Sequence, residues 1–322
     1  MPSLKVVFLS APDASYLPQL KQVPSDVDLL LGNSMEEVGQ AVEDADVLVN
    51  GMGTGNLFKQ VFPRAKKLQW VHSLSAGVEN VLIPELVNSE LPLTNARGVF
   101  AESLGEFVLA SMLFFAKHLG TMRKNQAERK WDQFDVDVLF RQSMAVVGYG
   151  EIGKAAARRG KALGMKVYAT RRRPELMKGD PIVDEAFSVD RRAEMMSKAD
   201  YVVVSAALTP ETRGLVGEKE IAGMKKTGVI INVGRGPVID EAALIQALQE
   251  KRIRGAGLDV FDHEPLPQAH PFWGMENVLM SPHCADHIEG WLDDAARFFL
   301  QNLERFKKGE ELKNIVDKHA GY

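Results

Sequence analysis

Short runs of apolar residues, separated by polar segments with helical periodicity, recur along the first third of this chain. Within each run the apolar residues are contiguous rather than alternating. This pattern is typical of strands in a parallel sheet whose two faces are both covered. The sequence therefore predicts strands at residues 5–11, 27–32, 46–51 and 68–74.

The middle of the chain repeats this strand–helix alternation more strongly. Its strand candidates are "SMAVVGYG" (143–150), "KVYAT", "YVVVSAA", "GVIINVG", "GAGLDVF" and "VLMSPH", and the chain ends with the amphipathic helix "WLDDAARFFLQNLERFKKG". Strands that alternate with helices indicate βαβ units and a doubly wound sheet. We predict an α/β fold with two doubly wound lobes, the second inserted before the chain ends.

One helical segment differs from the others because it is apolar on nearly all sides. This segment, "ESLGEFVLASMLFFAKHL", covers residues 102–119. A helix of this kind is buried on most of its surface. We expect a domain junction or a subunit interface to cover it.

Composition and charge narrow the class of protein. Of the 322 residues, 45% are hydrophobic and 25% are charged, and the net charge is −4. These values are ordinary for a soluble globular protein and predict no general affinity for nucleic acid or membrane. The apolar run near the N-terminus, 6–9, is too short for a signal peptide, so we expect a cytoplasmic protein. A single cysteine, Cys284, excludes a disulfide framework, and we expect it to be a small buried residue.

The stretch "VVGYGEIG" carries glycines with G-x-G-x-x-G spacing, between an apolar strand and a helix-favouring run. In this context Gly148 makes the tight turn, Gly150 lets the backbone approach a pyrophosphate, and Gly153 lets the helix and the strand pack closely. The phosphates then lie at the helix N-terminus. A strand–helix turn without a ligand is the alternative.

The second strand of this unit ends in "YATRRRP", where a site for NAD usually carries a carboxylate about 20 residues after the glycines. Arg171 stands there instead. A guanidinium can bind a 2′-phosphate with two hydrogen bonds, whereas a carboxylate repels it. We expect Arg171 and Arg172, with the hydroxyl of Thr170, to bind the extra phosphate of NADP. The alternative is a solvated basic turn on an NAD enzyme.

Three polar residues follow late strands, where ligands of open α/β sheets bind. They are Arg235 in "INVGRGPVID", Glu264 in "GLDVFDHEPLP" and His283 in "LMSPHCADH". Arginine suits a carboxylate or a polarised carbonyl, and histidine suits proton exchange near neutral pH. A glutamate beside the histidine would favour the imidazolium. Each residue alone has an ordinary structural explanation, but their joint occurrence behind a dinucleotide-binding unit predicts an active site.

Over essentially its whole length the chain resembles the D-isomer-specific 2-hydroxyacid dehydrogenases. The resemblance rests on "SLSAGVENVL", "TNARG", "VVGYGEIGKAAARRGKALGMKV", "LTPETRGLV", "INVGRGPVIDEAAL", "GAGLDVFDHEPLP", "SPHCA" and "NIVDKHAGY". It implies a Rossmann dinucleotide-binding domain, residues 98–286, inserted into a flavodoxin-like substrate domain of residues 1–97 and 287–322. It also implies a homodimer formed through the helix 102–119.

The resemblance assigns roles to individual residues. His283 would be the general acid towards the keto oxygen, Glu264 would pair with it, and Arg235 would orient the substrate. Asp259 would contact the nicotinamide amide. The resemblance places Leu74, Ala76, Gly77 and Arg235 in the substrate-binding set. The Gly-rich stretch "NGMGTGN" after a strand adds Met52 and Gly53 to this set, with a mere turn as the alternative, and Trp291 is a further candidate for the wall of the substrate pocket. The cofactor-binding set would be Gly148, Tyr149, Gly150, Glu151, Ile152, Gly153, Thr170, Arg171, Arg172, Ala206, Ala207, Leu208, Thr209, Val233, Gly234, Asp259 and His283.

Several features depart from the family pattern. Arg171 replaces the acidic NAD-selecting residue, and Ala207 replaces a proline, with little expected chemical effect. Gly105 lies inside the long helix, where glycine costs about 1 kcal/mol relative to alanine unless close packing requires it. No effector domain follows "AGY", so the resemblance is to short reductases rather than to long phosphoglycerate dehydrogenases.

The resulting prediction is an NADPH-preferring reductase of glyoxylate or hydroxypyruvate type, with NAD as a possible second cofactor and no metal. The spacing of His283 and His287 does not favour a metal site, because the segment around them reads as a strand end rather than a helix. We expect Trp131 and Trp291 to serve packing more than binding. Two other functions are compatible with the sequence: a dinucleotide-sensing corepressor that binds peptides, and a phosphite dehydrogenase. Glu264 argues against a formate dehydrogenase.

Overall fold

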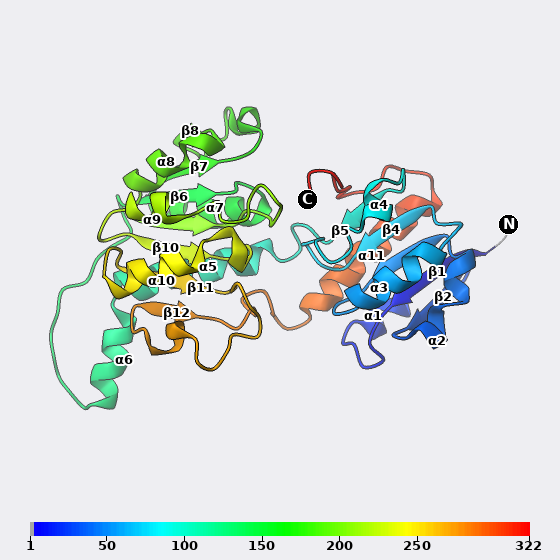
Figure 1. Ribbon diagram of the computed structural model, residues 1–322, viewed down its shortest axis with the longest axis horizontal. Coiled ribbons are helices and arrows are strands. Elements are labelled where there is room, and N and C mark those ends of the chain that lie inside the picture. Colours follow the sequence, from blue (N-terminus) through cyan, green and yellow to red (C-terminus); the bar gives the residue numbers. More distant parts are fainter. Residues whose placement is uncertain (1–2) are drawn as a thin grey trace. The chain divides into compact units, whose positions relative to one another are not determined.

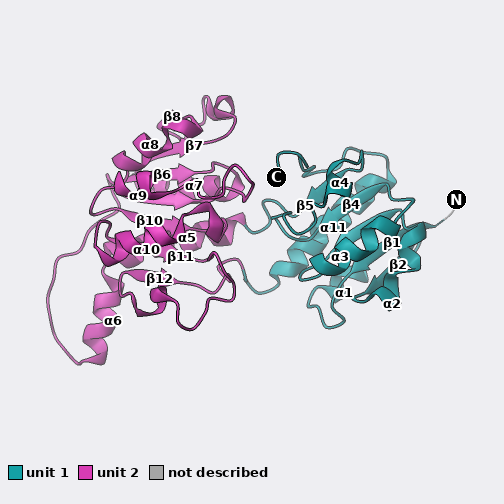
Figure 2. Cartoon of the chain, in the orientation of Figure 1, with its two compact units in different colours: residues 1–100, 287–322 teal, residues 101–286 magenta. Residues whose placement is uncertain are grey.

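The computed structural model describes residues 3–322, and the chain forms two compact units. Unit 1 combines residues 1–100 with 287–322, and unit 2 comprises Ala101–Asp286 (Figure 2). Among residues 3–322 we find no helix with the length and the apolar character needed to span a lipid bilayer.

Unit 1 is built on a parallel sheet of five strands in the order β2-β1-β3-β4-β5, the order of flavodoxin-like folds (Figure 1). The strands are β1 Leu4–Leu9, β2 Val27–Gly32, β3 Val47–Asn50, β4 Trp70–Ser73 and β5 Leu93–Asn95. The helices are α1 Leu17–Leu20, α2 Met35–Val38, α3 Gly55–Val61, α4 Pro84–Val87 and α11 Trp291–Lys307, with the 3-10 turns η1 Ala41–Asp44 and η2 Phe62–Arg64.

The last helix, α11, closes one face of this sheet although it comes from the far end of the chain. Its buried Phe299 stacks on Trp70 of β4, with ring centroids 5.6 Å apart, and meets Phe8 of β1 edge-on at 5.6 Å. Aromatic pairs at such distances add to the stabilisation from their buried area. The C-terminal segment therefore belongs to the core of unit 1.

Unit 2 is built on a parallel sheet of seven strands in the order β12-β11-β10-β9-β6-β7-β8. The strands are β6 Ser143–Val147, β7 Lys166–Thr170, β8 Glu185–Phe187, β9 Tyr201–Val204, β10 Val229–Asn232, β11 Gly255–Leu258 and β12 Val278–Met280. The helices are α5 Ala101–Ala116, α6 Leu119–Ala127, α7 Glu151–Ala162, α8 Arg192–Lys198, α9 Glu218–Ala222 and α10 Glu241–Gln249, with η3 Pro174–Met177, η4 Val189–Arg191, η5 Gly236–Val238 and η6 Pro271–Gly274.

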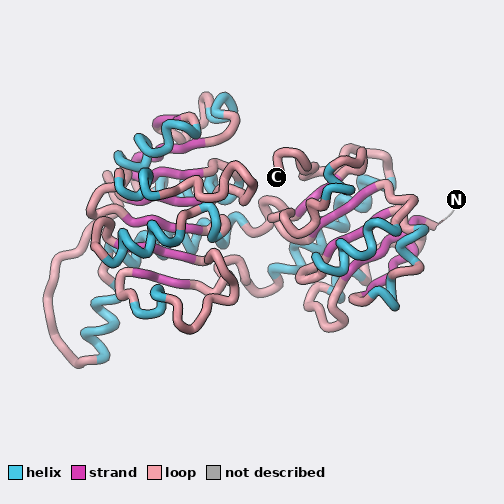
Figure 3. The backbone as a smooth tube through the Cα atoms, in the orientation of Figure 1, coloured by secondary structure: helices cyan, strands magenta, loops and turns pink. Residues whose placement is uncertain are grey.

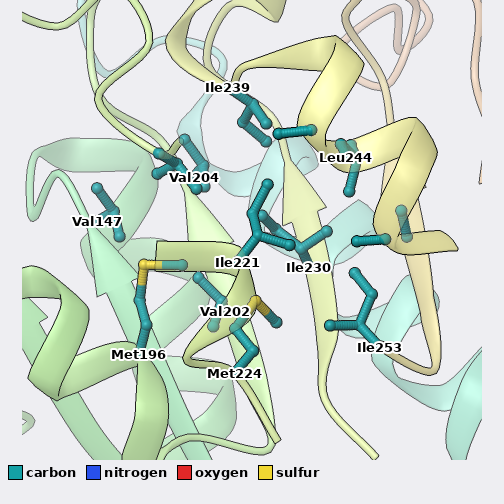
Figure 4. Packing of buried hydrophobic residues seen from close by; sticks show 14 of the residues in the cluster. Val147, Met196, Val202, Val204, Ile221, Met224, Ile230, Ile239, Leu244 and Ile253 are labelled. Carbon is teal, nitrogen blue, oxygen red and sulfur yellow. The ribbon is translucent and has the colours of Figure 1, made fainter. Parts of the chain in front are cut away.

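The strand order of unit 2 reverses between β6 and β9, as in Rossmann folds, and creates a topological switch point at the carboxyl end of β6. The predicted α/β fold with two doubly wound lobes is thus confirmed. Figure 4 shows how the strand residues of this unit, such as Val202 and Ile230, pack against Met196, Ile221 and Leu244 of the covering helices. Val203 and Ile231, which point to the other face of the sheet, are also fully buried. Burial on both faces explains the contiguous apolar runs of the sequence.

The predicted helix 102–119 is not continuous. Helix α5 ends at Ala116, and His118 adopts a left-handed conformation with φ 52° before α6 begins at Leu119. Gly105 lies where α5 packs closely on α7, because a Cβ there would lie 2.8 Å from the Arg159 guanidinium and 3.1 Å from the backbone and the Cβ of Ala155.

An irregular segment, residues 128–142, connects α6 to β6 (Figure 3). The side chain of Trp131 in this segment is 94% exposed, so the expectation that it serves core packing is wrong. Asp137 attaches this segment to the rest of unit 2. Its backbone N–H donates to the Ala116 carbonyl, and its carboxylate accepts a hydrogen bond from Arg254 at 2.6 Å.

Candidate functional site

The sequence-predicted residues of unit 2 lie at the carboxyl ends of several parallel strands of one sheet. The glycine turn follows β6, Arg171 follows β7, Arg235 follows β10, Asp259 follows β11 and His283 follows β12. Parallel strands place their carboxyl ends at one edge, where open α/β sheets bind ligands. Residues far apart in the sequence are therefore brought to a common edge.

The glycine turn has the geometry of a phosphate-binding loop. Gly148 has φ +95°, and Gly153 approaches the turn so closely that a Cβ there would lie 2.6 Å from the Gly148 carbonyl oxygen. Gly150 is different, because a Cβ built on it meets nothing within 4 Å. Gly150 is also the N-cap of α7, where no side chain caps the helix. The turn therefore leaves open space beside a helix N-terminus, which suits a pyrophosphate.

Ala206 occupies the space between two glycine turns. A Cβ at Gly148 would lie 2.6 Å from the Ala206 backbone, and one at Gly234 would lie 2.7 Å from the Ala206 carbonyl oxygen. The side chain of Ser205 donates to the Gly148 carbonyl at 2.9 Å. The segment 206–209, which follows β9, is therefore fixed between the turns after β6 and β10.

Arg171 and Arg172 lie where β7 ends, and Thr170 before them is buried. The charge of Arg172 helps to lower the pKa of Glu211, after the hydrogen bond from Thr209 and a backbone hydrogen bond. Thr209 Oγ1 donates to the Glu211 carboxylate at 2.7 Å. The charge of Arg172 therefore reaches Glu211, whose carboxylate is bound to Thr209 of the segment 206–209.

Arg235 stands in a turn that the strand before it holds in place. The amide of Asn232, at the end of β10, donates to the Arg235 carbonyl at 3.1 Å and accepts from the Gly234 N–H at 3.1 Å. A Cβ at Gly236 would lie 1.9 Å from the Phe261 carbonyl carbon, so this turn packs directly on the chain after β11. Our sequence reasoning missed Asn232; an amide at the end of an otherwise apolar strand was the available signal.

Glu264 and His283 form a short pair, with the carboxylate Oε2 2.6 Å from the imidazole Nδ1. The hydrogen bond to Glu264 raises the pKa of His283, against burial and against the charge of Arg235. Burial opposes ionisation of Glu264, but the hydrogen bonds from His283 and from the Phe261 N–H outweigh it and lower the pKa of this carboxyl group. The pair therefore favours imidazolium with carboxylate.

The backbone around His283 is held by Asp259. His283 has φ 51°, an uncommon conformation for a residue with a side chain, and its N–H donates to the Asp259 carbonyl at 2.9 Å. The buried Asp259 Oδ1 accepts the N–H groups of Cys284 and Ala285. Cys284 itself is exposed, so the prediction of a buried cysteine is wrong.

Unit 1 holds the predicted substrate-binding residues other than Arg235. The Asn95 amide donates to the Ala76 carbonyl at 2.5 Å and fixes the loop that contains Gly77. Ser75 Oγ lies 3.2 Å from Met52 Sδ, so this loop meets the turn of Met52 and Gly53, which has φ +76°.

Two other members of the predicted substrate-side set lie elsewhere in unit 1. Leu74 is fully buried. Trp291 packs on His287 and Phe100, with ring centroids 4.1 Å and 5.5 Å away.

These observations fit a dinucleotide in unit 2, because the turn around Gly150 offers both space and a helix N-terminus. Within the described range, residues 3–322, three or more His, Cys, Asp or Glu side chains do not gather in a way that could hold a metal ion.

Comparison with known sequences points to one family of dehydrogenases. The sequence model described as "D-isomer specific 2-hydroxyacid dehydrogenase, NAD binding domain" matches residues 109–285. A glyoxylate reductase of Korarchaeum cryptofilum is 32% identical over 296 residues, which cover 89% of this chain and 87% of the relative.

Solved structures resemble the chain over almost its full length. A D-isomer specific 2-hydroxyacid dehydrogenase of Xanthobacter autotrophicus, in complex with NADPH and MES, is 31% identical, covers 99% of this chain and 100% of its own, and has a TM-score of 0.86. An NADPH-dependent glyoxylate/hydroxypyruvate reductase of Sinorhizobium meliloti, with NADP and sulfate, is 25% identical with the same coverage and a TM-score of 0.85.

The glycine turn generates a prediction with an internal control. Gly150→Ala should leave the melting temperature unchanged, because its Cβ enters open space, but should weaken dinucleotide binding at least about tenfold by occupying the phosphate position. Gly153→Ala should instead lower the melting temperature, because its Cβ would clash with the Gly148 carbonyl. Thermal melting and NADPH fluorescence titration measure both effects. Unimpaired binding by a folded Gly150→Ala variant would contradict the assignment.

Proposed function

This chain belongs to the D-isomer specific 2-hydroxyacid dehydrogenase family, and on that basis we propose that it reduces a small 2-keto acid of glyoxylate or hydroxypyruvate type to a D-2-hydroxy acid. The observation that carries the proposal is the 2.6 Å contact of His283 with Glu264, at the sheet edge that also carries the glycine turn. The nicotinamide cofactor, when bound, supplies the hydride for the keto carbon.

His283 is the proton donor in this proposal. An ionised Glu264 can only accept hydrogen bonds, so Nδ1 of His283 carries the hydrogen that lies between them. The other ring nitrogen, Nε2, is then the atom that gives a proton to the keto oxygen. The raised pKa keeps a larger fraction of His283 protonated near neutral pH, which suits a general acid.

Arg235 orients the substrate in this proposal. The charge of Arg235 is felt by both His283 and Glu264, which supports a position close to the reacting atoms. A guanidinium there stabilises the negative charge that grows on the keto oxygen and orients the carboxylate.

We propose that the preferred cofactor is NADPH. The end of β7 carries Thr170, Arg171 and Arg172 and no carboxylate, so a 2′-phosphate meets positive charge there. The relatives from Xanthobacter autotrophicus and Sinorhizobium meliloti, whose structures contain NADPH or NADP, are consistent with this preference.

The experiment that tests the function follows absorbance at 340 nm with NADPH or NADH and a panel of 2-keto acids, including glyoxylate, hydroxypyruvate, pyruvate and an aryl-pyruvate. We expect turnover with NADPH to exceed that with NADH by about tenfold or more, because charge-assisted hydrogen bonds hold the 2′-phosphate. His283→Ala should lower kcat by about 100-fold or more. His319→Ala, which changes an exposed histidine of unit 1, should retain the wild-type rate.

Other outcomes of this assay point to other functions. Preference for NADH would keep the chemistry but reduce the arginines to a surface turn. Turnover of phosphite in the oxidising direction, without turnover of any keto acid, would replace the substrate class. Peptide binding without any turnover would favour a corepressor-like role.

The Glu264–His283 pair predicts a pH dependence. Reduction requires protonated His283, so the rate is lost as pH rises through the pKa of this histidine, which Glu264 raises. Glu264→Gln removes the negative charge and should move this alkaline limb of kcat/KM to lower pH. Glu241→Gln is the matched control, because Glu241 pairs with His270 at 3.1 Å in the same unit and should leave the limb in place. An unmoved limb in Glu264→Gln would refute the pairing.

We also propose that the protein is a homodimer formed through α5 and the segment 119–140. Four apolar residues of α5 are only partly buried, and the segment exposes Trp131, Val138 and Phe140. Exposed apolar surface of this extent marks an interaction site, and a second copy of the chain is the proposed occupant. Light scattering should give twice the chain mass, and Trp131→Glu should shift it towards the monomer. Trp273→Glu, which changes another exposed tryptophan, should leave the measured mass at that of the dimer. A monomeric mass for the wild type would refute the proposal.

A further inference from the structure

The residues 171–180, here named the arginine segment, leave β7 and return towards the glycine turn. Both ends of this segment are bound to one residue, Tyr149. The backbone N–H of Tyr149 donates to the carbonyl of Thr170, immediately before the segment, at 2.9 Å. The hydroxyl of the same tyrosine donates to the carboxylate of Asp180, at the end of the segment, at 3.1 Å.

Tyr149 is a rigid attachment point for this purpose. It stands between Gly148 and Gly150 in the phosphate-binding turn, and its side chain is only 1% exposed. Burial raises the pKa of its hydroxyl, and the hydrogen bond to Asp180 raises it further, against the charge of Arg171. The hydroxyl is therefore a hydrogen-bond donor throughout the neutral range, and Arg171 lies close enough to influence it.

Asp180 transmits this attachment to the segment. Its second carboxylate oxygen accepts the Ile182 N–H at 3.0 Å, and its own N–H donates to the Met177 carbonyl at 3.1 Å. Met177 is buried, whereas Arg172 and Arg173 are exposed. The segment is thus anchored at Met177 and Asp180, while Arg172 and Arg173 are exposed and Arg171 is half-buried.

We propose that the hydrogen bond between Tyr149 and Asp180 holds the arginine segment in the position at which Arg171 meets the 2′-phosphate of NADPH, so that both residues are positioning residues for cofactor selectivity. This inference rests on the proposed preference for NADPH. A segment held in its binding conformation loses less conformational entropy when the ligand binds, and this raises affinity. NADH lacks the 2′-phosphate, so its affinity gains little from an arginine segment that is already held in place.

Because Asp180 is negatively charged, its removal should change the affinity for NADPH in opposite directions under two explanations. A carboxylate near a phosphate site repels the phosphate, so electrostatics alone predicts that removing Asp180 tightens NADPH binding. Loss of the hydrogen bond predicts the opposite. Asp180→Ala, at a half-buried position, therefore separates the two effects.

The test measures the Kd of NADPH and of NADH by fluorescence titration, without substrate, for the wild type and five variants. Tyr149→Phe and Asp180→Ala should each raise the Kd of NADPH by about three- to tenfold while the Kd of NADH stays within about twofold, as expected for one lost hydrogen bond to a charged group. Asp180→Asn should retain most of the preference, because its amide can still bond to both Tyr149 and the Ile182 N–H. Arg171→Ala should lower the preference most.

The matched control is Tyr16→Phe in unit 1. Tyr16 is also buried, and its hydroxyl donates to Ser10 at 2.8 Å, so this variant loses a comparable hydrogen bond. It should lower the melting temperature without changing the ratio of the two Kd values. The ratio therefore distinguishes positioning from a general loss of stability.

Three results would overturn the inference in distinguishable ways. If Arg171→Ala lowers the preference but Tyr149→Phe and Asp180→Ala do not, the positioning role fails and the proposed cofactor site stands. If Asp180→Ala tightens NADPH binding, Asp180 acts through its charge. If Arg171→Ala leaves the ratio unchanged, the proposed NADPH site itself is wrong, and the positioning role fails with it. If Tyr149→Phe does not fold, the direction in which Asp180→Ala changes the Kd of NADPH still tests the positioning role.

Discussion

The catalytic proposal for unit 2 depends on a short contact between the Glu264 carboxylate and the His283 ring. Its 2.6 Å separation joins residues that follow different strands, β11 and β12, and therefore depends on how the chain leaves each of them. Asp259 fixes the backbone on the histidine side, and the close packing of Gly236 on Phe261 fixes the turn of Arg235 against the glutamate side. The catalytic proposal depends on this packing, because a proton donor acts only within hydrogen-bond reach of its target.

The proposed cofactor site at the same sheet edge also depends on close backbone packing, here around glycine residues. At Gly148, Gly153 and Gly234 the absence of a side chain allows close backbone approach, whereas at Gly150 it leaves open space. One sequence pattern thus contains glycines with opposite functions, one kind serving packing and the other serving a ligand. Only the surroundings of each glycine distinguish them.

Much of this arrangement could be predicted from the sequence, since contiguous apolar runs indicate parallel strands and parallel strands bring their ends together. The strands β5 and β8 were not predicted, because each has three residues that mix polar and apolar types, whereas the equally short β12 is wholly apolar. The break at His118 was missed as well, since no proline interrupts the apolar helix there. The contact of Tyr149 with Asp180 joins residues 31 positions apart and depends on how a loop returns, which no periodicity encodes.

The division of the chain into units has a consequence for biosynthesis. Unit 2 is continuous in sequence and is complete at residue 286, whereas the core of unit 1 requires Phe299 from the last helix to cover Phe8 and Trp70. Domains generally fold as units during synthesis, beginning from the N-terminal side. In this protein unit 2 can fold first, while one apolar face of the sheet of unit 1, which is synthesised earlier, remains uncovered. The nascent chain therefore presents that face to chaperones or to aggregation until its final helix leaves the ribosome.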